Sequence, residues 1–204
     1  MKKVFILLLT ISLSVSFTSC KSDKKADKTT DAEKNAAFSL KKATNEINFT
    51  AYKFTEKTPV GGQFRQIDIT AGGAGNTIKE AIHNTEFSIP VSSIFTKDSS
   101  RDYKIQKSFF GVMSNTKLLS GKLMIENDSI GAAMIQMNGV TEKVPFKYTI
   151  VENTFAMSAT MDVSNWKALD ALASLNKVCE ALHTGADGVS KTWSDVALNI
   201  TSEF

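Results

Sequence analysis

The chain has 204 residues, a formal net charge of +3 at neutral pH and two cysteines. A chain of this length suits one domain with a sizeable hydrophobic core. The charge excess is small, and Lys2 and Lys3 at the N-terminus carry two of its three units. Because the sequence has no basic patch with interleaved aromatic residues, we do not expect nucleic acid as a partner.

The first twenty residues have the organisation of an export signal. Lys2 and Lys3 precede an apolar run from Val4 to Phe17, and small residues and Cys20 follow. The run is shorter than the roughly 20 apolar residues of a membrane-spanning helix. A cysteine at the cleavage point is similar to a bacterial lipoprotein signal, so residues 1–19 are predicted to be removed and Cys20 to be lipidated. The alternative is an ordinary secretory signal that is cut nearby.

A polar stretch separates this signal from the rest of the chain. Residues 21–35 carry both signs of charge and no large apolar side chain, so residues 20–35 are predicted to form the lipidated cysteine and a solvated tether. By resemblance to lipoprotein sorting signals, Lys21 favours a cell-envelope protein anchored in the outer membrane, on its periplasmic face or at the surface. With Cys20 acylated, Cys179 has no partner for a disulfide. Residues 36–204 are predicted to form the domain.

From Ala36 onward, apolar and polar residues alternate as in strands with one dry face. Short turn signals such as Asn138-Gly139 make neighbouring runs antiparallel. About eight runs on a meander predict a mainly β fold, an eight-stranded antiparallel barrel without exposed edges. The alternating positions are Ile47 to Ala51, Gln63 to Ile69, Phe87 to Val91, Leu119 to Ile125, Gly131 to Met137, Val144 to Ile150, Phe155 to Val163, and Val196 to Ile200.

Two stretches are predicted to be helical. A short polar helix is expected around residues 98–107, and an amphipathic helix is expected in the C-terminal region from Trp166 to His183. Ser164 or Asn165 can cap its start, and Gly185 can end it. The apolar stripe of this helix contains Trp166, Leu169, Leu172, Ala173, Cys179 and Leu182. The glycine-rich stretch 71–76 lacks the ending of a phosphate-binding loop and is predicted to be a flexible loop.

Cys179 and His183 stand four residues apart on this helix, with Asp187 just beyond. The spacing suits a metal site or a nucleophilic pair, but a closed zinc site needs four ligands. Cys179 also lies in the apolar stripe, where a free cysteine packs as a small hydrophobic side chain. Without a nucleophile elbow or a zinc-protease motif, no enzyme activity, metal or cofactor is expected. An enzyme that acts on a lipid head group through these three residues stays an alternative.

Arg101-Asp102 has two interpretations. An adjacent pair of opposite charges is usually a solvated surface feature and contributes little. The functional interpretation puts Arg101 near the mouth of the barrel, where its five donors could orient a polar head group.

Three stretches, in matching order, resemble YceI-like proteins over roughly residues 37–204. They are Tyr52 to Phe64, which resembles the early strand pair of that family; Ser92-Ser93-Ile94-Phe95-Thr96 with Arg101-Asp102 and Phe109-Phe110; and Asn138-Gly139-Val140-Thr141-Glu142-Lys143-Val144. Asn138 stands where the family commonly has His, and Met113 to Thr116 replace its Tyr-Pro. The resemblance implies a lipocalin-like barrel that holds a polyisoprenoid chain in its lumen, for transport, storage or protection.

A ligand of this kind needs few polar contacts, because apolar burial contributes about 25 cal/mol per Å². The alternative is an envelope interaction protein whose barrel is filled by its own side chains, since barrels of this size occur in both forms. The resemblance adds a homodimer as a further possible partner. The residues expected to line the lumen are Phe155, Met157, Ala159, Met161, Val144, Phe146 and Tyr148, with Arg101 at the mouth.

Overall fold

The computed structural model describes residues 35–204. The predicted signal, the lipidated Cys20 and all of the tether except its last residue lie outside the described residues. None of the helices within 35–204 combines the length and the apolar character needed to cross a membrane.

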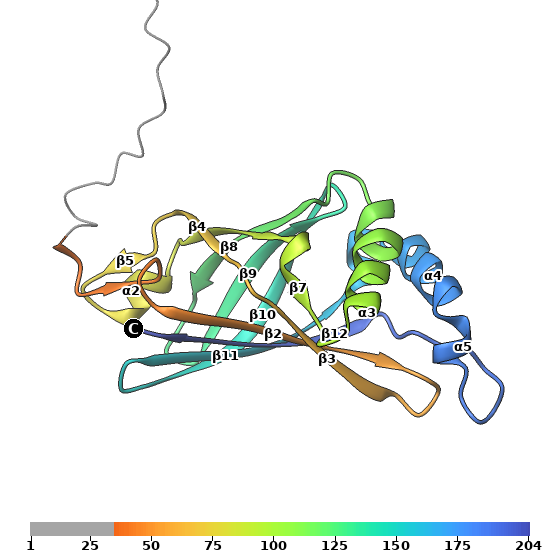
Figure 1. Cartoon of the computed structure of the whole chain (residues 1–204). Coiled ribbons are helices and arrows are strands. Elements are labelled where there is room, and N and C mark those ends of the chain that lie inside the picture. Colours follow the sequence, from red (N-terminus) through yellow and green to blue (C-terminus); the bar gives the residue numbers. More distant parts are fainter. Residues whose placement is uncertain (1–34) are drawn as a thin grey trace, which may run out of the picture.

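The described chain is mainly β, with short helical segments between the strands (Figure 1). The strands are β1 (Phe38–Ser39), β2 (Thr44–Lys53), β3 (Thr58–Phe64), β4 (Asp68–Ala71), β5 (Ala74–Gly75), β6 (Glu86–Pro90), β7 (Ile94–Phe95), β8 (Leu118–Ile125), β9 (Ile130–Met137), β10 (Val140–Val151), β11 (Thr154–Asp162) and β12 (Asp195–Glu203). The α-helices are α2 (Ile78–Ile82), α3 (Ser99–Lys104), α4 (Leu169–Val178) and α5 (Glu180–His183). The other helical turns are η1 (Val91–Ser93), η2 (Ile105–Phe109), η3 (Phe110–Val112) and η4 (Val163–Trp166).

Ten strands form one antiparallel, curled sheet in the order β4-β6-β8-β9-β10-β11-β12-β2-β3-β7. Tight turns make this meander possible. Asn138 and Gly139, with φ of 51° and 71°, reverse the chain between β9 and β10, which is the left-handed geometry that a two-residue hairpin turn requires. Glu152, with φ of 54°, does the same between β10 and β11. The predicted mainly β, antiparallel architecture is therefore confirmed.

The predicted number of eight strands is not confirmed, because the main sheet contains ten. The difference arises where two extended segments are interrupted. A three-residue break separates β3 from β4, and the turn η1 separates β6 from β7. The two segments nevertheless lie side by side, because β3 pairs with β7, β4 pairs with β6, and Arg65 N–H donates to Ser93 O at 3.0 Å between them.

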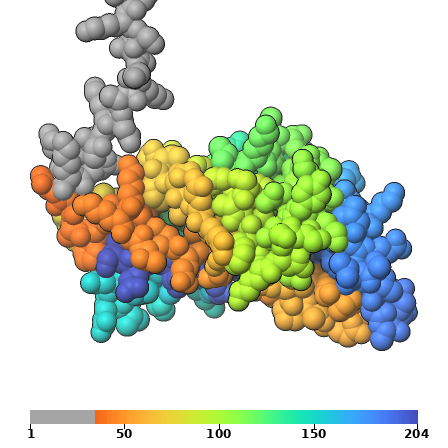
Figure 2. Space-filling view, in the orientation of Figure 1, coloured from red at the N-terminus to blue at the C-terminus, as the bar shows by residue number. Residues whose placement is uncertain are grey.

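Helical segments occupy both ends of the curled sheet (Figure 1). At one end α2 lies beside the small sheet formed by β1 and β5. At the other end α3 continues into η2, which packs against α4. Figure 2 shows these two helical segments, in green and blue, meeting at the surface at that end. We call it the helical end. The predicted flexible loop 71–76 instead contains the strand β5, and α2 was not predicted.

The predicted helix from Trp166 to His183 is broken into η4, α4 and α5. The break follows Lys167, whose φ of 55° lies in the left-handed region and ends η4. Neither predicted cap is used, because the Asp162 carboxylate accepts from Ser164 N–H at 2.9 Å at the start of η4. The predicted apolar stripe is also wrong in part, since Leu169 and Leu182 are 54% and 57% exposed.

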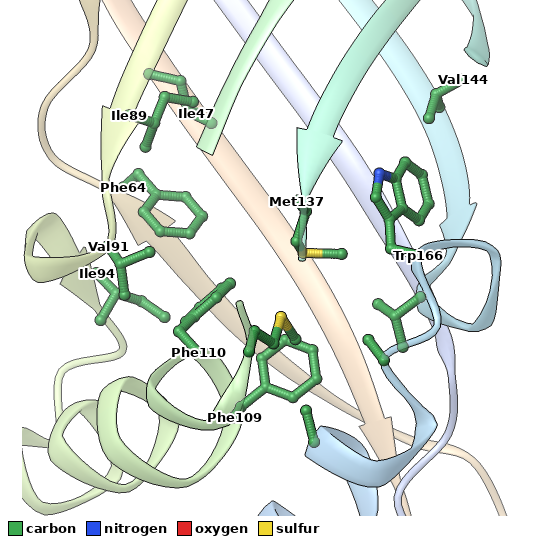
Figure 3. Packing of buried hydrophobic residues seen from close by; sticks show 14 of the residues in the cluster. Ile47, Phe64, Ile89, Val91, Ile94, Phe109, Phe110, Met137, Val144 and Trp166 are labelled. Atoms are coloured by element: carbon green, nitrogen blue, oxygen red, sulfur yellow. The ribbon is translucent and has the colours of Figure 1, made fainter. Parts of the chain in front are cut away.

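One of the two clusters of the hydrophobic core lies between the sheet and the helical end. Figure 3 shows Phe64, Phe109, Phe110 and Met137 pointing toward one another from strands and helical turns. Trp166 is 1% exposed, and its indole N–H donates to Ile135 O at 2.9 Å. This hydrogen bond satisfies the only polar atom of a large buried ring, as burial of tryptophan requires.

Candidate functional site

An apolar cavity of about 210 Å³ lies inside the curled sheet. Its volume far exceeds the roughly 10–15 Å³ that one water molecule requires. Four polar residues line it, and none of the described lining residues is charged. The polar residues are Asn45, Thr85, Thr192 and Ser202. A cavity with this lining suits an apolar ligand, because polar molecules would find few hydrogen-bond partners there.

Strand alternation builds the largest part of the wall. The side chains of β11 that line the cavity are two residues apart, from Phe155 to Met161, as expected because successive side chains in a strand point to opposite faces. Pairing between strands continues this apolar surface from β11 across β12 to β2. Met157 is opposite Ile200 of β12, and Ile200 is opposite Ile47 of β2. Three neighbouring strands thus present one continuous apolar surface to the cavity.

Five of the predicted lumen residues line this cavity. They are Val144, Phe155, Met157, Ala159 and Met161. That they contact a ligand stays a prediction, but their side chains face the space in which a ligand would lie.

Phe146 and Tyr148, which were also expected to line the lumen, do not line the cavity. Both rings pack against Phe155, with ring centroids 6.4 and 5.3 Å away, in a buried cluster that includes Ile82 of α2. The Tyr148 hydroxyl donates to Asn127 O at 2.7 Å. Helix α2, which was not predicted from the sequence, contributes Ile78 and Ile82 to this cluster. The C-terminal half of β10 therefore belongs to the packed core at this end of the sheet.

Arg101 does not line the cavity either. It lies on α3 with its side chain 42% exposed, and its guanidinium is 3.8 Å from the Asp98 carboxylate. The neighbouring Asp102 accepts hydrogen bonds from the backbone and hydroxyl of Thr96, at 2.8 and 2.7 Å. The two residues of the pair therefore have different roles. Asp102 holds the turn before α3, while the Arg101 guanidinium makes, among the described residues, only the long contact with Asp98.

The helical end supplies wall residues that the sequence analysis missed. Phe109 and Phe110, from η2 and η3, face the cavity together with Leu172 and Leu175 of α4. Their two rings are 4.9 Å apart between centroids. The chain changes from a π-helical turn to a 3₁₀ turn between these two residues. Hydrophobic periodicity does not signal such a change, although the paired aromatics were a visible motif.

A small polar cluster lies where the helical end meets the cavity. The Thr192 hydroxyl, at the cavity wall, is 2.7 Å from His183 Nδ1 and donates to Asn176 Oδ1 at 2.7 Å. Burial lowers the pKa of His183, and the cations Lys53, Arg101 and Lys104 lower it further. His183 is therefore expected to be neutral at pH 7.

The structure does not assemble Cys179, His183 and Asp187 into one site. The Cys179 side chain is buried, and burial raises the pKa of its thiol, which disfavours a reactive thiolate. Asp187 instead accepts from the Thr55 hydroxyl at 2.7 Å in a surface loop. Within residues 35–204, no group of three or more His, Cys, Asp or Glu side chains is placed to hold a metal ion.

Solved structures share this fold at low sequence identity. A polyisoprenoid-binding domain from Saccharophagus degradans is 12% identical with a TM-score of 0.57, and the match covers 82% of this chain and 98% of that one. BcnA of Burkholderia cenocepacia is 11% identical with a TM-score of 0.52, covering 81% and 98%. The YCEI protein of Campylobacter jejuni is 16% identical with a TM-score of 0.50, covering 74% and 88%.

No curated protein gives a significant match. The model of one protein family, the YceI-like domain, matches residues 38–204. This stretch contains every strand of the curled sheet and all the residues that line the cavity. The chain belongs to the YceI-like family.

Proposed function

We propose that this chain is a cell-envelope lipoprotein that binds a long apolar lipid, such as a polyisoprenoid, in the cavity. The observation that carries the proposal is an open cavity of about 210 Å³ with a lining that is almost wholly apolar. A second support is the likeness of the fold to a domain described as polyisoprenoid-binding. Transport, storage or protection of the lipid would each use the same cavity.

The open volume favours this function over a barrel filled by its own side chains. Each buried methylene group contributes about 0.8 kcal/mol, so an extended apolar chain gains affinity along its whole length. Methionines 137, 157 and 161 line the cavity. Their flexible, polarisable side chains can adapt to a chain that itself bends.

We further infer that the sheet acts as a closed eight-stranded barrel. If β3 with β4, and β6 with β7, are each counted as one interrupted strand, the ten strands become eight. The pairs β3–β7 and β4–β6 then join the two edges of the sheet. A barrel of eight strands is wide enough to hold one small ligand, which fits the proposed role.

Organic extraction of the purified chain, followed by mass spectrometry of the extract, tests the proposal. We expect an apolar lipid to co-purify with the wild-type protein. The variant Ala159→Phe places a ring in the cavity and should lose the lipid, because Ala159 lies on the wall. Ala156→Phe on the same strand is the control, since Ala156 does not line the cavity.

Two results would contradict the proposed function. One is a wild-type extract that contains no lipid beyond the level of a blank purification. The other is equal lipid content in the Ala159→Phe and Ala156→Phe variants, because a ligand in the cavity must respond to the ring that occupies it.

A further inference from the structure

The inward row of β2 ends in a cation at the helical end of the cavity. Asn45, Ile47, Phe49 and Ala51 line the cavity at every second position of this strand. Lys53 is the next residue on the same face. It is half-buried, and its ammonium group donates to Leu182 O at 3.0 Å. Lys53 does not line the cavity itself, so the apolar row of β2 continues into a positively charged residue just beyond the cavity, beside Leu182 of α5.

The polar cluster lies at the same place. The backbone of Thr192 pairs with Lys53, which fixes the Thr192 hydroxyl at the cavity wall beside the cation. His183 and Asn176 hold this hydroxyl from the other side, each at 2.7 Å. Hydrogen-bonding groups and a charge thus converge on one end of a space that is otherwise apolar.

Helix α3 brings two more cations to this end. Lys104 immediately precedes Ile105, a residue of the cavity wall, and Arg101 lies one turn earlier. Both are half-buried. Among the described ion pairs, Lys104 and Lys53 have none, and Arg101 has only its long contact with Asp98. Partly buried cations without close counter-ions attract an anion more strongly than exposed ones do.

The charged groups that lower the pKa values of His183 and Cys179 agree with this placement of the cations. For both residues they are Lys53, Arg101 and Lys104, and none of them is a carboxylate. The field at this end of the cavity is therefore positive. His183 adds no charge, because burial and these cations keep the pKa of its imidazole below the ordinary value.

We propose that Lys53, Arg101 and Lys104 form, beside the polar cluster of Thr192 and His183, a binding subsite for an anionic head group, such as a phosphate ester, on the apolar ligand. The inference rests on the proposed function, because the chain of the ligand would occupy the cavity. Lysine and arginine donate charge-assisted hydrogen bonds to phosphate oxygens. The Thr192 hydroxyl already donates its proton to Asn176 and lies 2.7 Å from His183 Nδ1, so these two groups form a neutral polar wall beside the cations. The ligand class is thus an amphiphile with one acidic end.

The test compares two ligands that share one chain. Geranylgeranyl monophosphate and geranylgeraniol are titrated separately into purified chain from which lipid has been extracted. Binding is followed by isothermal titration calorimetry. We expect the phosphate to bind at least about tenfold more tightly than the alcohol, a difference of about 1.4 kcal/mol. The double variant Arg101→Gln with Lys104→Gln should lose this preference and keep its affinity for the alcohol.

A control variant separates a local subsite from a general effect of net charge. Lys107→Gln with Lys177→Gln removes the same number of charges from η2 and α4, and both lysines are exposed. This variant should keep the preference for the phosphate. Inorganic phosphate alone, in a third titration, should bind far more weakly than the lipid phosphate.

Each contrary result has a distinct meaning. Equal affinity for the phosphate and the alcohol overturns the subsite and leaves the proposed function intact. A preference lost equally in both double variants, or inorganic phosphate binding as tightly as the lipid phosphate, also overturns it. Failure of both lipids to bind contradicts the proposed function itself, and the subsite with it.

Discussion

Three phenylalanine rings each lie across a glycine of the neighbouring strand. Phe49 faces Gly62, Phe87 faces Gly121 and Phe146 faces Gly131 in the register of the sheet. A Cβ atom at these glycines would come within 2.3 to 2.7 Å of the ring, which is closer than atoms can approach. The missing side chain of each glycine therefore lets a ring lie flat on the sheet, and two of these rings, Phe49 and Phe87, line the cavity.

Gly131→Ala should lower the free energy of unfolding by about 1–3 kcal/mol, the usual effect of overpacking a core. The added methyl group would meet both the Phe146 ring and the Met124 carbonyl oxygen. Chemical denaturation measures the loss. Gly61→Ala is the matched control, because its Cβ would have only one neighbour, at 4.0 Å, and we expect a change within about 0.5 kcal/mol. Equal effects of the two substitutions would contradict this packing argument.

His183 should make the stability depend on pH. Its pKa is lower in the folded chain than its ordinary value of 6.5, so below pH 6.5 the unfolded state binds more protons. The contribution of neutral His183 is therefore complete above 6.5 and is lost as the pH falls below it. Urea denaturation at a series of pH values should show a smaller decline for His183→Gln than for wild type. Identical declines would show that His183 is not held neutral by the fold.

At the scale of the elements, alternation predicted the strands well, because a sheet with one buried face imposes period two on its sequence. The stretches expected to form β8 to β12 do so, except that Val163 already belongs to η4, and five of the seven expected lumen residues line the cavity. What alternation could not predict was the break near Lys167 and the helix α2. The break and the helix both depend on local backbone geometry and on long-range packing, and the periodicity of apolar residues carries no information about either.

The same limit explains the errors at the candidate site. Phe146 and Tyr148 continue the inward row of Val144, so alternation alone does not distinguish them from Val144. Their different role follows from α2, which covers only their end of β10. Conversely, Lys53 follows Ala51 at the next inward position of β2. Extending the alternation by these two residues would have identified a charged residue at the end of the apolar row.

Asp162→Ala should destabilise the chain by about 0.5–2 kcal/mol through loss of the cap of η4. The Asp162 carboxylate accepts from Ser164 N–H. Hydrogen bonding with the Ser164 side chain, and then this backbone bond, holds the pKa of Asp162 below its ordinary value. Trp166, which ends η4, reports unfolding by its fluorescence. Asp162→Asn keeps a capping oxygen and should retain most of the stability. If Asn were as harmful as Ala, the charge rather than the cap would be the cause.

At the scale of the whole molecule, the predicted lipid anchor and the proposed lipid-binding cavity are compatible with each other. The predicted anchor and tether would keep the domain beside a membrane, where apolar lipids are found. Stable anchoring takes more than one acyl chain, since a single one binds reversibly. Cys20, which would carry these chains, lies outside the described residues.

Cys20→Ser should move the protein out of the membrane fraction, because serine cannot be acylated by the lipoprotein pathway. Cell fractionation followed by detergent partitioning measures the change. The Cys179→Ser variant is the control and should stay with the membrane, because Cys179 is buried in the domain. Unchanged partitioning of Cys20→Ser would contradict the anchor and leave the cavity argument untouched.

Native mass spectrometry of the purified wild-type chain shows directly whether a lipid occupies the cavity. We expect a population whose mass exceeds that of the protein by one apolar lipid per chain, and we expect this excess mass to disappear on collisional activation. The Ala159→Phe variant should show only the mass of the protein. A wild-type spectrum with the protein mass alone, from cells in which the chain was made and exported, would contradict the claim that the cavity holds a lipid.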